Sequence, residues 1–261
     1  MQAPLNLNRQ DAVARVRMQR GDVHNAFDAR LIAELTETFE TLNADPTIRV
    51  VVLEAEGASF SAGADLNWMR GMAAMSEEEN RIDSLALARL MRSLDELSKP
   101  VVARVQGSAF GGGVGLIACC DIAIGSADAK FGLTESKLGL LPAVISPYVV
   151  NAIGPRQARR YFATGEIFNA ADAQRIGLLH DVVAPDALDE TVDRIVRTLL
   201  KAAPIAAGRA KALVRDVLAD ENAQMQDARN AALIAALRVS PEGQEGLAAF
   251  LEKRTPNWIK N

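Results

Sequence analysis

Cysteine is scarce in this sequence, and the placement of the two cysteines excludes a disulfide-stabilised fold. Cys119 and Cys120 are adjacent, and neighbouring cysteines make a poor disulfide framework. The first residues, Met1–Asn8, carry neither a basic segment nor an apolar segment of the kind that directs secretion. We therefore expect a cytoplasmic protein in which both thiols are reduced and serve as packing residues.

Long apolar runs and histidine are also rare. The best apolar run, Val114–Cys120, stops at Asp121 and is too short to cross a membrane. The two histidines, His24 and His180, have no carboxylate or cysteine at the spacing of metal ligands. These absences predict a soluble protein that has no membrane association and binds no metal.

Positive charge is not in excess. The net charge is −4 and the pI is about 5.4. No run of lysine or arginine interrupts the sequence. A mildly acidic chain without a basic cluster is a poor binder of nucleic acids and of anionic membranes, so we expect neither as a partner.

The first half of the 261-residue chain alternates predicted strands with predicted helices. Helical spacing of apolar residues predicts helices over Asp28–Asn43 and Ser76–Leu97, and Ser76 with Glu79 forms a capping-box pattern. This alternation indicates an α/β fold. The predicted strands are Ala12–Met18, Val50–Leu53, Val101–Val105, Asp121–Ile124 and Ala129–Phe131.

The second half changes character and is dominated by helices. Three of its four predicted helices have a proline near the start, where the missing N–H does no harm. We find no long linker or low-complexity segment. The predicted helices are Pro185–Leu200, Pro204–Leu218, Glu221–Leu237 and Pro241–Lys253.

Two glycine-rich loops are the strongest local signal. Phe60–Leu66 follows one predicted strand, and Gly107–Gly115 follows another and leads into a helix around Leu116–Cys120. Either loop alone is typical of a simple turn. Together, in two strand-to-helix connections, they indicate backbone amides aimed at a ligand that develops negative charge.

Other chemistries fit these residues poorly. Gly113–Ala118 matches the dinucleotide pattern G-x-G-x-x-A, but Gln106–Gly112 separates it from the preceding strand. No Gly-Lys-Ser/Thr follows the glycines, which excludes a Walker A loop. Ser61 and Ser108 have no visible His/Asp partners, so serine hydrolase chemistry is unsupported.

Five segments, in the right order, resemble the crotonase superfamily of enoyl-CoA hydratases and isomerases. The resemblance covers nearly the whole chain, and this combination of motifs is highly specific. The segments are Asn25-Ala26, Phe60–Leu66 (F-x-A-G-A-D-L), Gly107–Asp121 (G-x-A-x-G-G-G…C-D), Phe131–Pro142 (F-x-x-x-E…G-x-x-P) and Phe250–Trp258.

The resemblance implies an α/β fold, a crotonase-like spiral of ββα units over residues 1–200, followed by a helical trimerisation region over residues 201–261. It implies a homotrimer or a dimer of trimers that acts on acyl-CoA, with CoA as part of the substrate and no separate cofactor. It places the oxyanion-hole amides at Ala64 and Gly112. It assigns contacts with CoA or substrate to Val23, His24, Ala26, Ala62, Gly63, Asp65, Leu66, Gly111 and Gly115.

The carboxylates depart from the pattern of a typical hydratase. Glu135 aligns with the second catalytic glutamate of the family, but Gly115 stands where the first glutamate is expected. Two routes remain open for Glu135 alone. It could move a proton between C2 and C4 as an isomerase, or it could activate water and return a proton as a hydratase (a lyase), with Gly115 leaving space for a bulky acyl chain.

A finer resemblance favours hydration. Ser61–Arg70 and Leu140–Val150 are similar to bacterial methylglutaconyl-CoA hydratases, which act in leucine degradation, and to their carboxygeranoyl-CoA relatives. Such substrates carry a branched, carboxylated acyl chain, so we expect a cation near the acyl end. Arg70 and Lys137 are candidates by sequence position only.

Overall fold

The computed structural model describes residues 3–219 and 222–259, whose strands form two sheets. The larger sheet has the order β1-β2-β3-β5-β7-β10, and the smaller has the order β4-β6-β8-β9. β1 runs antiparallel to β2, and β9 antiparallel to β8, whereas the other neighbours are parallel. The strands are β1 (Leu5–Gln10), β2 (Val13–Met18), β3 (Val50–Ala55), β4 (Ser59–Ser61), β5 (Val101–Val105), β6 (Ser108–Phe110), β7 (Ile122–Ser126), β8 (Lys130–Gly132), β9 (Ile167–Asn169) and β10 (Asp181–Val183).

Consecutive strands enter different sheets, and a helix follows each pair. β3 and β4 lead to α2 (Leu66–Ala74), and β5 and β6 lead to α4 (Gly112–Cys119). β7 and β8 lead through the 3-10 turn η2 (Glu135–Leu138) to α5 (Ser146–Thr164). Three strand–strand–helix units thus form the core, which confirms the predicted α/β spiral.

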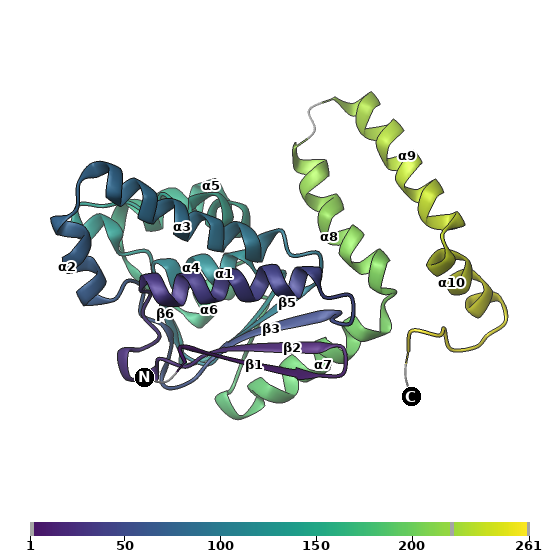
Figure 1. Cartoon of the computed structure of the whole chain (residues 1–261), viewed down its shortest axis with the longest axis horizontal. Helices are drawn as coiled ribbons and strands as arrows, with labels where there is room; N and C mark the ends of the chain where they lie inside the picture. Colours follow the sequence, from purple (N-terminus) through teal and green to yellow (C-terminus); the bar gives the residue numbers. More distant parts are fainter. Residues whose placement is uncertain (1–2, 220–221, 260–261) are drawn as a thin grey trace.

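Helix α1 (Ala29–Ala44) lies over one face of the larger sheet, and α3 (Glu77–Asp95) packs against α1 and α4 (Figure 1). Asp28 Oδ1 caps α1 by accepting a hydrogen bond from the Leu31 amide at 2.7 Å. The predicted capping box of Ser76 and Glu79 is present at the start of α3. Caps of this kind satisfy amides that have no partner within a helix, so both predicted helices begin where the sequence indicates.

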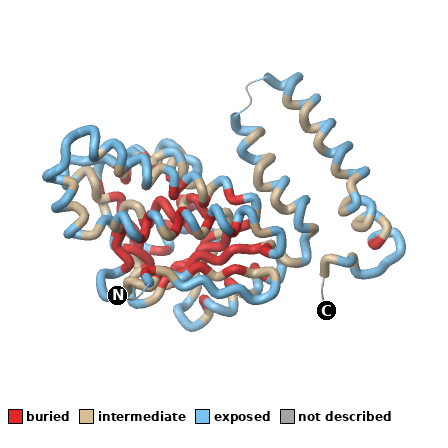
Figure 2. Tube along the Cα trace, in the orientation of Figure 1, coloured by how far each residue is buried: buried red, intermediate tan, exposed pale blue. Residues whose placement is uncertain are grey.

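Helix α7 (Leu188–Lys201) covers the opposite face, after the 3-10 turn η3 (Pro185–Ala187). β3 is therefore buried on both faces, as Figure 2 shows for the centre of the molecule. This explains why Val50–Leu53 is a continuous apolar run rather than an alternating one. The apolar cluster under α7 comprises Val50, Val52, Val102, Ile124, Leu188, Val192 and Val196.

The C-terminal helices form an arm that projects away from the sheets (Figures 1 and 2). The arm consists of α8 (Pro204–Ala219), α9 (Ala223–Val239) and α10 (Pro241–Leu251). Its surface carries many exposed apolar side chains, a pattern typical of surfaces that contact another protein. They include Ile205, Val214, Leu218, Met225, Ile234, Val239, Leu247, Phe250 and Leu251.

Some elements differ from the sequence prediction. α4 begins at Gly112 instead of near Leu116, because glycine lowers helix propensity but does not forbid a helix. The predicted helix Glu221–Leu237 is observed from Ala223, and Glu221 lies outside the described residues. Elements that the sequence does not predict are mainly short: β1, β4, β6, β9, β10, η1 (Gly21–Val23) and α6 (Ala170–Arg175), together with α5.

Candidate active site

The loop after β4 is fixed by backbone pairing with Phe27. The Phe27 amide donates to the Gly63 carbonyl at 2.7 Å, and the Asp65 amide donates to the Phe27 carbonyl at 2.8 Å. In a parallel bridge, these bonds leave the N–H of the residue between them, Ala64, directed to the other side. Within residues 3–219 and 222–259 the Ala64 amide has no hydrogen-bond acceptor, so this donor is free.

A second free donor lies at the start of α4. Gly112 is the first residue of the helix, and an amide at this position has no partner within the helix. The turn before it is held by Gly111, whose amide donates to the Gly132 carbonyl at 3.0 Å. Gly111 has φ +50° and ψ −118°, a conformation that favours glycine. The two predicted donor loops therefore each present an amide at the carboxyl end of a strand.

Glu135 lies beside the glycine turn of α4. A β-carbon on Gly111 would be 3.2 Å from Glu135 Oε1. The other carboxylate oxygen, Oε2, is buried and has no hydrogen-bond partner in the described part of the chain. Burial raises the pKa of the Glu135 carboxyl, because desolvation disfavours the charged form. Such a group can take up and release a proton closer to neutrality than an ordinary glutamate.

The expectation that Gly115 leaves space for a bulky acyl chain is wrong. A β-carbon on Gly115 would lie only 2.3 Å from Ile145 Cγ2. Ile145 is itself buried, so its side chain already fills this volume. Gly115 is likewise buried within α4, and the direction in which its side chain would point is occupied by Ile145.

The predicted CoA loop meets the first glycine-rich loop. The Ala62 amide donates to the His24 carbonyl at 2.9 Å, and His24 Nδ1 lies 3.1 Å from Ser59 Oγ. Val23, His24, Ala62, Ala64 and Leu66 are exposed on this rim, whereas Ala26 and Gly63 are buried beneath it. The structure thus brings these predicted contact residues together along one accessible edge.

Asn25 is the structural anchor of this edge. Its side-chain amide donates to the carbonyls of Glu56 and Ser59, both at 2.8 Å, and its Oδ1 accepts the Arg20 amide at 2.9 Å. Asn25 is fully buried and has φ +53°, a conformation that asparagine tolerates better than most residues. The Asn25 side chain in this motif therefore holds the backbone of the loop in place.

Arg20 is a further residue of this edge, and the sequence alone does not indicate its role. Its Nη2 lies 2.9 Å from Asp28 Oδ2 and 3.2 Å from Asp65 Oδ2, and Nη1 donates to the Ala26 carbonyl. Asp28 caps α1 and Asp65 caps α2, so one guanidinium joins the starts of two helices. Aspartate before each helix indicates an N-cap, but it does not indicate that one arginine joins the two caps.

These contacts affect the pKa of the Asp65 carboxyl. Burial opposes ionisation, but the amides of Asn67 and Trp68 and the Arg20 guanidinium together hold its pKa below the ordinary value. Asp65 is therefore charged at neutral pH and can anchor α2 next to the Ala64 amide.

The contacts that the two predicted acyl-end cations make are with other parts of the chain. Arg70 Nη1 donates to Asn67 Oδ1 at 2.8 Å on the exposed side of α2. The Lys137 side chain lies next to Gly165, since a β-carbon there would be 3.2 Å from Lys137 Cε. The recognition of an acyl carboxylate by either residue is not supported by these contacts.

The remaining candidates have structural surroundings. His180 Nδ1 accepts the Ala123 amide at 3.0 Å. Cys119 and Cys120 are buried, and burial raises the pKa of both thiols, which suppresses nucleophilic thiolate. Among the described residues, no group of three or more His, Cys, Asp or Glu could hold a metal ion. None of the described helices is long and apolar enough to span a membrane.

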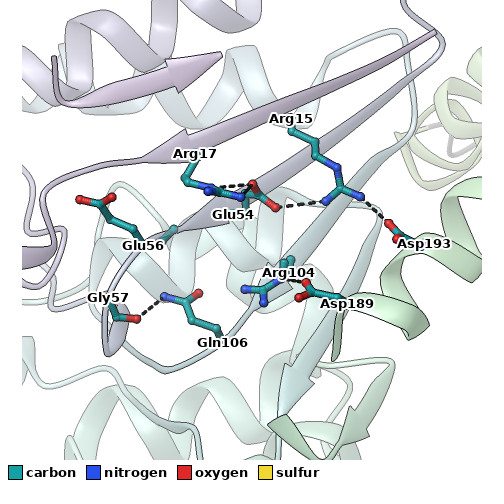
Figure 3. Close-up of a pocket in the computed structure, with 10 residues that line it drawn as sticks. Arg15, Arg17, Glu54, Glu56, Gly57, Arg104, Gln106, Asp189 and Asp193 are labelled. Atoms are coloured by element: carbon teal, nitrogen blue, oxygen red, sulfur yellow. Dashed lines mark hydrogen bonds and ion pairs between the residues drawn. The ribbon is translucent and has the colours of Figure 1, made fainter. Parts of the chain in front are cut away.

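A separate cavity of about 500 Å³ lies on the α7 side of the larger sheet (Figure 3). Arg15 and Arg17 both pair with Glu54, at 3.1 and 2.7 Å, and Arg104 pairs with Asp189 at 2.5 Å. Each arginine of this cavity already has a carboxylate partner, so the cavity has little capacity left for an anion. We therefore regard it as an ion-pair network outside the candidate active site.

Comparison with known proteins gives a consistent result. A family model for enoyl-CoA hydratase/isomerase matches residues 8–261. The chain is 31% identical to the crotonyl-CoA hydratase of Syntrophomonas wolfei, over 97% of this chain and 96% of that protein. It is 31% identical to the 2,3-dehydroadipyl-CoA hydratase of Escherichia coli, over 97% and 98%. A crystal structure of an enoyl-CoA hydratase from Shewanella pealeana superimposes with a TM-score of 0.95 at 44% identity, covering 98% of this chain and 96% of that one.

Proposed function

The chain belongs to the enoyl-CoA hydratase/isomerase family, and we propose that it hydrates a branched 2-enoyl-CoA of the methylglutaconyl-CoA type. The family and its relatives make it a CoA-thioester enzyme of the hydratase type. The observation that carries the proposal is the pair of free amides, at Ala64 and Gly112, next to one desolvated carboxyl group, Glu135.

In the proposed mechanism, the thioester oxygen accepts hydrogen bonds from the Ala64 and Gly112 amides. Glu135 takes a proton from water as the water oxygen bonds to C3, and the electrons of the C2=C3 bond move into the thioester to give an enolate. The amides stabilise the negative oxygen without reorganising. Glu135 then gives its proton to C2, which re-forms the thioester and restores the carboxylate.

The acyl group that we propose is branched and carboxylated. Support comes from the similarity of Ser61–Arg70 and Leu140–Val150 to methylglutaconyl-CoA hydratases, and from a relative whose name specifies 2,3-dehydroadipyl-CoA, a thioester with a free carboxylate. Exposed apolar residues next to Glu135, namely Leu138, Leu140 and Leu141, offer an apolar rim for such a chain. A role in leucine degradation follows from the same substrate.

We also propose that CoA lies along the edge formed by Val23, His24, Ala26, Ala62, Gly63, Asp65, Leu66 and Gly111, with no separate cofactor or metal. The exposed apolar surface of α8–α10 favours assembly into a homotrimer or a dimer of trimers. The cytoplasm is the proposed location.

Double-bond isomerisation is the second candidate. The observation that favours it is Gly115, since the described site then holds one carboxyl group near the free amides, and a single group suffices to move a proton between C2 and C4. Water addition is the step that separates the two reactions.

The experiment is an incubation of the purified protein with 3-methylglutaconyl-CoA, linear 2-enoyl-CoAs and a 3-enoyl-CoA in H₂¹⁸O. Hydration places ¹⁸O in the product hydroxyl. Conversion of the 3-enoyl-CoA to the 2-enoyl-CoA without label would support the isomerase instead. Absence of label with every 2-enoyl-CoA would overturn the proposed hydration.

A further inference from the structure

The volume beside Gly115 is filled by a rigid part of the chain. A β-carbon on Gly115 would be 2.3 Å from Ile145 Cγ2, 2.9 Å from Ile145 Cβ and 3.4 Å from Met91 Cε. Real β-carbons do not approach other atoms within 3.0 Å. Both of the closest atoms belong to the branched stem of one side chain, which has few conformations to choose from. Position 115 therefore cannot carry a side chain while Ile145 stays in place.

Ile145 is also held by its backbone. Its carbonyl accepts the Val149 amide at 3.1 Å, and it stands at the N-cap position of α5. Its side chain is only 3% exposed. The side chain cannot swing aside without opening the start of α5 or entering the core, and protein cores are too closely packed to accept it.

Ile145 and Glu135 lie over successive parts of the same glycine-rich stretch of α4. The Gly115 amide donates to the Gly111 carbonyl at 3.2 Å, one turn earlier. A β-carbon on Gly111 would point at Glu135, and one on Gly115 would point at Ile145. Both side chains come from one segment, because Glu135 begins η2 and Ile145 is the N-cap of the next helix, α5. Within this segment the Leu140 amide donates to the Glu135 carbonyl at 3.0 Å.

We infer that Ile145 is a specificity-determining residue: paired with Gly115, it closes the wall of the acyl site beyond Glu135 and keeps that site to a single carboxyl group. The steric part of this inference stands on geometry alone, while the acyl-chain part rests on the proposed hydratase function. The sizes of residues 115 and 145 thus depend on each other: a side chain at position 115 requires a smaller residue at position 145.

The steric part is tested by thermal unfolding of the full chain at fixed protein concentration, which matters if the chain assembles. Gly115→Ala should lower Tm by roughly 2–12 °C, the shift expected from overpacking in a chain of this size. Ile145→Gly removes both clashing atoms, and glycine is tolerated at an N-cap. In Gly115→Ala/Ile145→Gly, the loss should therefore be smaller than the sum of the two single losses.

Ile145→Val is the matched control, because valine keeps both Cβ and Cγ2. Gly115→Ala/Ile145→Val should show no relief. Losses that add in both double variants would overturn the steric pairing, since residues that share a clash are coupled. Relief by valine as well as by glycine would also overturn it. This readout does not depend on catalysis, so it stands even if the proposed reaction is wrong.

The acyl-chain part is tested with Ile145→Ala, Ile145→Val and the wild type on 2-enoyl-CoAs graded in length and branching. Ile145→Ala should raise kcat/KM for the bulkier chains relative to crotonyl-CoA by about tenfold, the size of effect that methylene-sized pocket changes produce. A merely structural loss would lower kcat/KM for all substrates by the same factor. The ratio of kcat/KM between the bulkier chains and crotonyl-CoA would then be unchanged, and this result would overturn the inference. A wild type that hydrates none of the panel would overturn the proposed function, and the unfolding experiment would still decide the pairing.

Discussion

The ring of Phe27 lies directly against Gly112: a β-carbon on Gly112 would be 2.9 Å from Phe27 Cε2. The backbone of the same phenylalanine pairs with Gly63 and Asp65 on either side of Ala64. Phe27 is 1% exposed, so the ring has little freedom to shift. The spacing between the two free amides is therefore set through one buried residue that need not touch the substrate.

Phe27→Leu should lower kcat while leaving KM for the acyl-CoA little changed. The shorter side chain weakens the contact with Gly112, so the Gly112 amide is held less accurately relative to Ala64. Loss of a full oxyanion donor costs about 10²–10³ in kcat, and a misplaced donor costs part of that. We expect a fall of about 10-fold to 100-fold in steady-state assays.

Phe39→Leu is the control for this prediction. Phe39 is fully buried on α1 and belongs to the same core cluster, so the volume lost is the same. Both variants should lose stability, but only Phe27→Leu should lose kcat. Equal losses of kcat in the two variants would show that general core packing, and not the spacing of the amides, is responsible.

Glu135→Gln should abolish turnover and leave CoA binding largely intact. The Glu135 carboxyl is desolvated and has a raised pKa, whereas a glutamine amide cannot accept and return the proton. In the wild type, kcat/KM should rise with pH through this raised pKa as the base ionises. Turnover assays and CoA titrations test this assignment, and a fully active Glu135→Gln would refute it.

The same substitution predicts that the stability difference between the variant and the wild type depends on pH. An acid whose pKa is higher in the folded state than in the unfolded state binds more protons when folded, so its contribution to stability is present below the unfolded pKa of about 4.3 and is lost as pH rises through the folded pKa. Relative to the wild type, Glu135→Gln should therefore become more stable as pH rises through this window. Denaturant unfolding at a series of pH values gives the comparison. A relative stability that falls with pH would contradict burial as the cause.

Arg20→Lys should weaken both the fold and substrate binding. A lysine carries its charge on a single compact ammonium group. It therefore cannot contact Asp28, Asp65 and the Ala26 carbonyl together, as the guanidinium does. We expect a loss of about 1–3 kcal/mol in the free energy of unfolding and a raised KM, because the proposed CoA-binding edge and the start of α2 are both released. Arg30→Lys, in an exposed pair with Glu34, should cost about 0.5 kcal/mol or less.

The Asp65 part of this effect has a defined pH dependence. The pKa of Asp65 is lower in the folded protein than its ordinary value, so its stabilising contribution is present above the unfolded pKa of about 3.9 and is lost as pH falls through the folded pKa. The stability gap between wild type and Arg20→Lys should narrow on acidification. A gap that stays constant down to the acid limit would place the effect of Arg20 elsewhere.

The sequence predicts the α/β core because its signals are local. α1 and α3 have apolar spacing and caps within a few residues, and β5 spans Val101–Val105 as predicted. β4 and β6 have only three residues each, which is too little alternation to distinguish a strand from a turn. They become strands because they pair with each other, in positions set by β3 and β5.

The candidate site, like the fold, is predictable from the sequence only in part. Glycine patterns indicate where Ala64 and Gly112 lie, and the resemblance indicates Glu135, but their catalytic roles stay predictions. Ile145 and Phe27 carry no sequence signal, because each acts on a glycine that is distant in the chain and their contacts arise only on folding. Gly115 is the instructive error: the missing side chain suggested space, yet another part of the chain fills it.

Glu54→Gln should destabilise the fold and leave kcat unchanged, although Glu54 lines the cavity in Figure 3. The Glu54 carboxylate is 4% exposed and joins Arg15 to Arg17. Removing one partner of a buried ion pair leaves the other charge uncompensated. When both partners are buried, this lowers the free energy of unfolding by about 3–5 kcal/mol. Here the arginines are partly exposed and screened by solvent, so about 1–3 kcal/mol is expected. Arg15 also contacts Asp193, which limits the loss further for this arginine.

Unfolding measurements together with the steady-state assay separate the effect of Glu54→Gln on stability from its effect on catalysis. A normal Tm with reduced kcat would mean that the cavity takes part in catalysis.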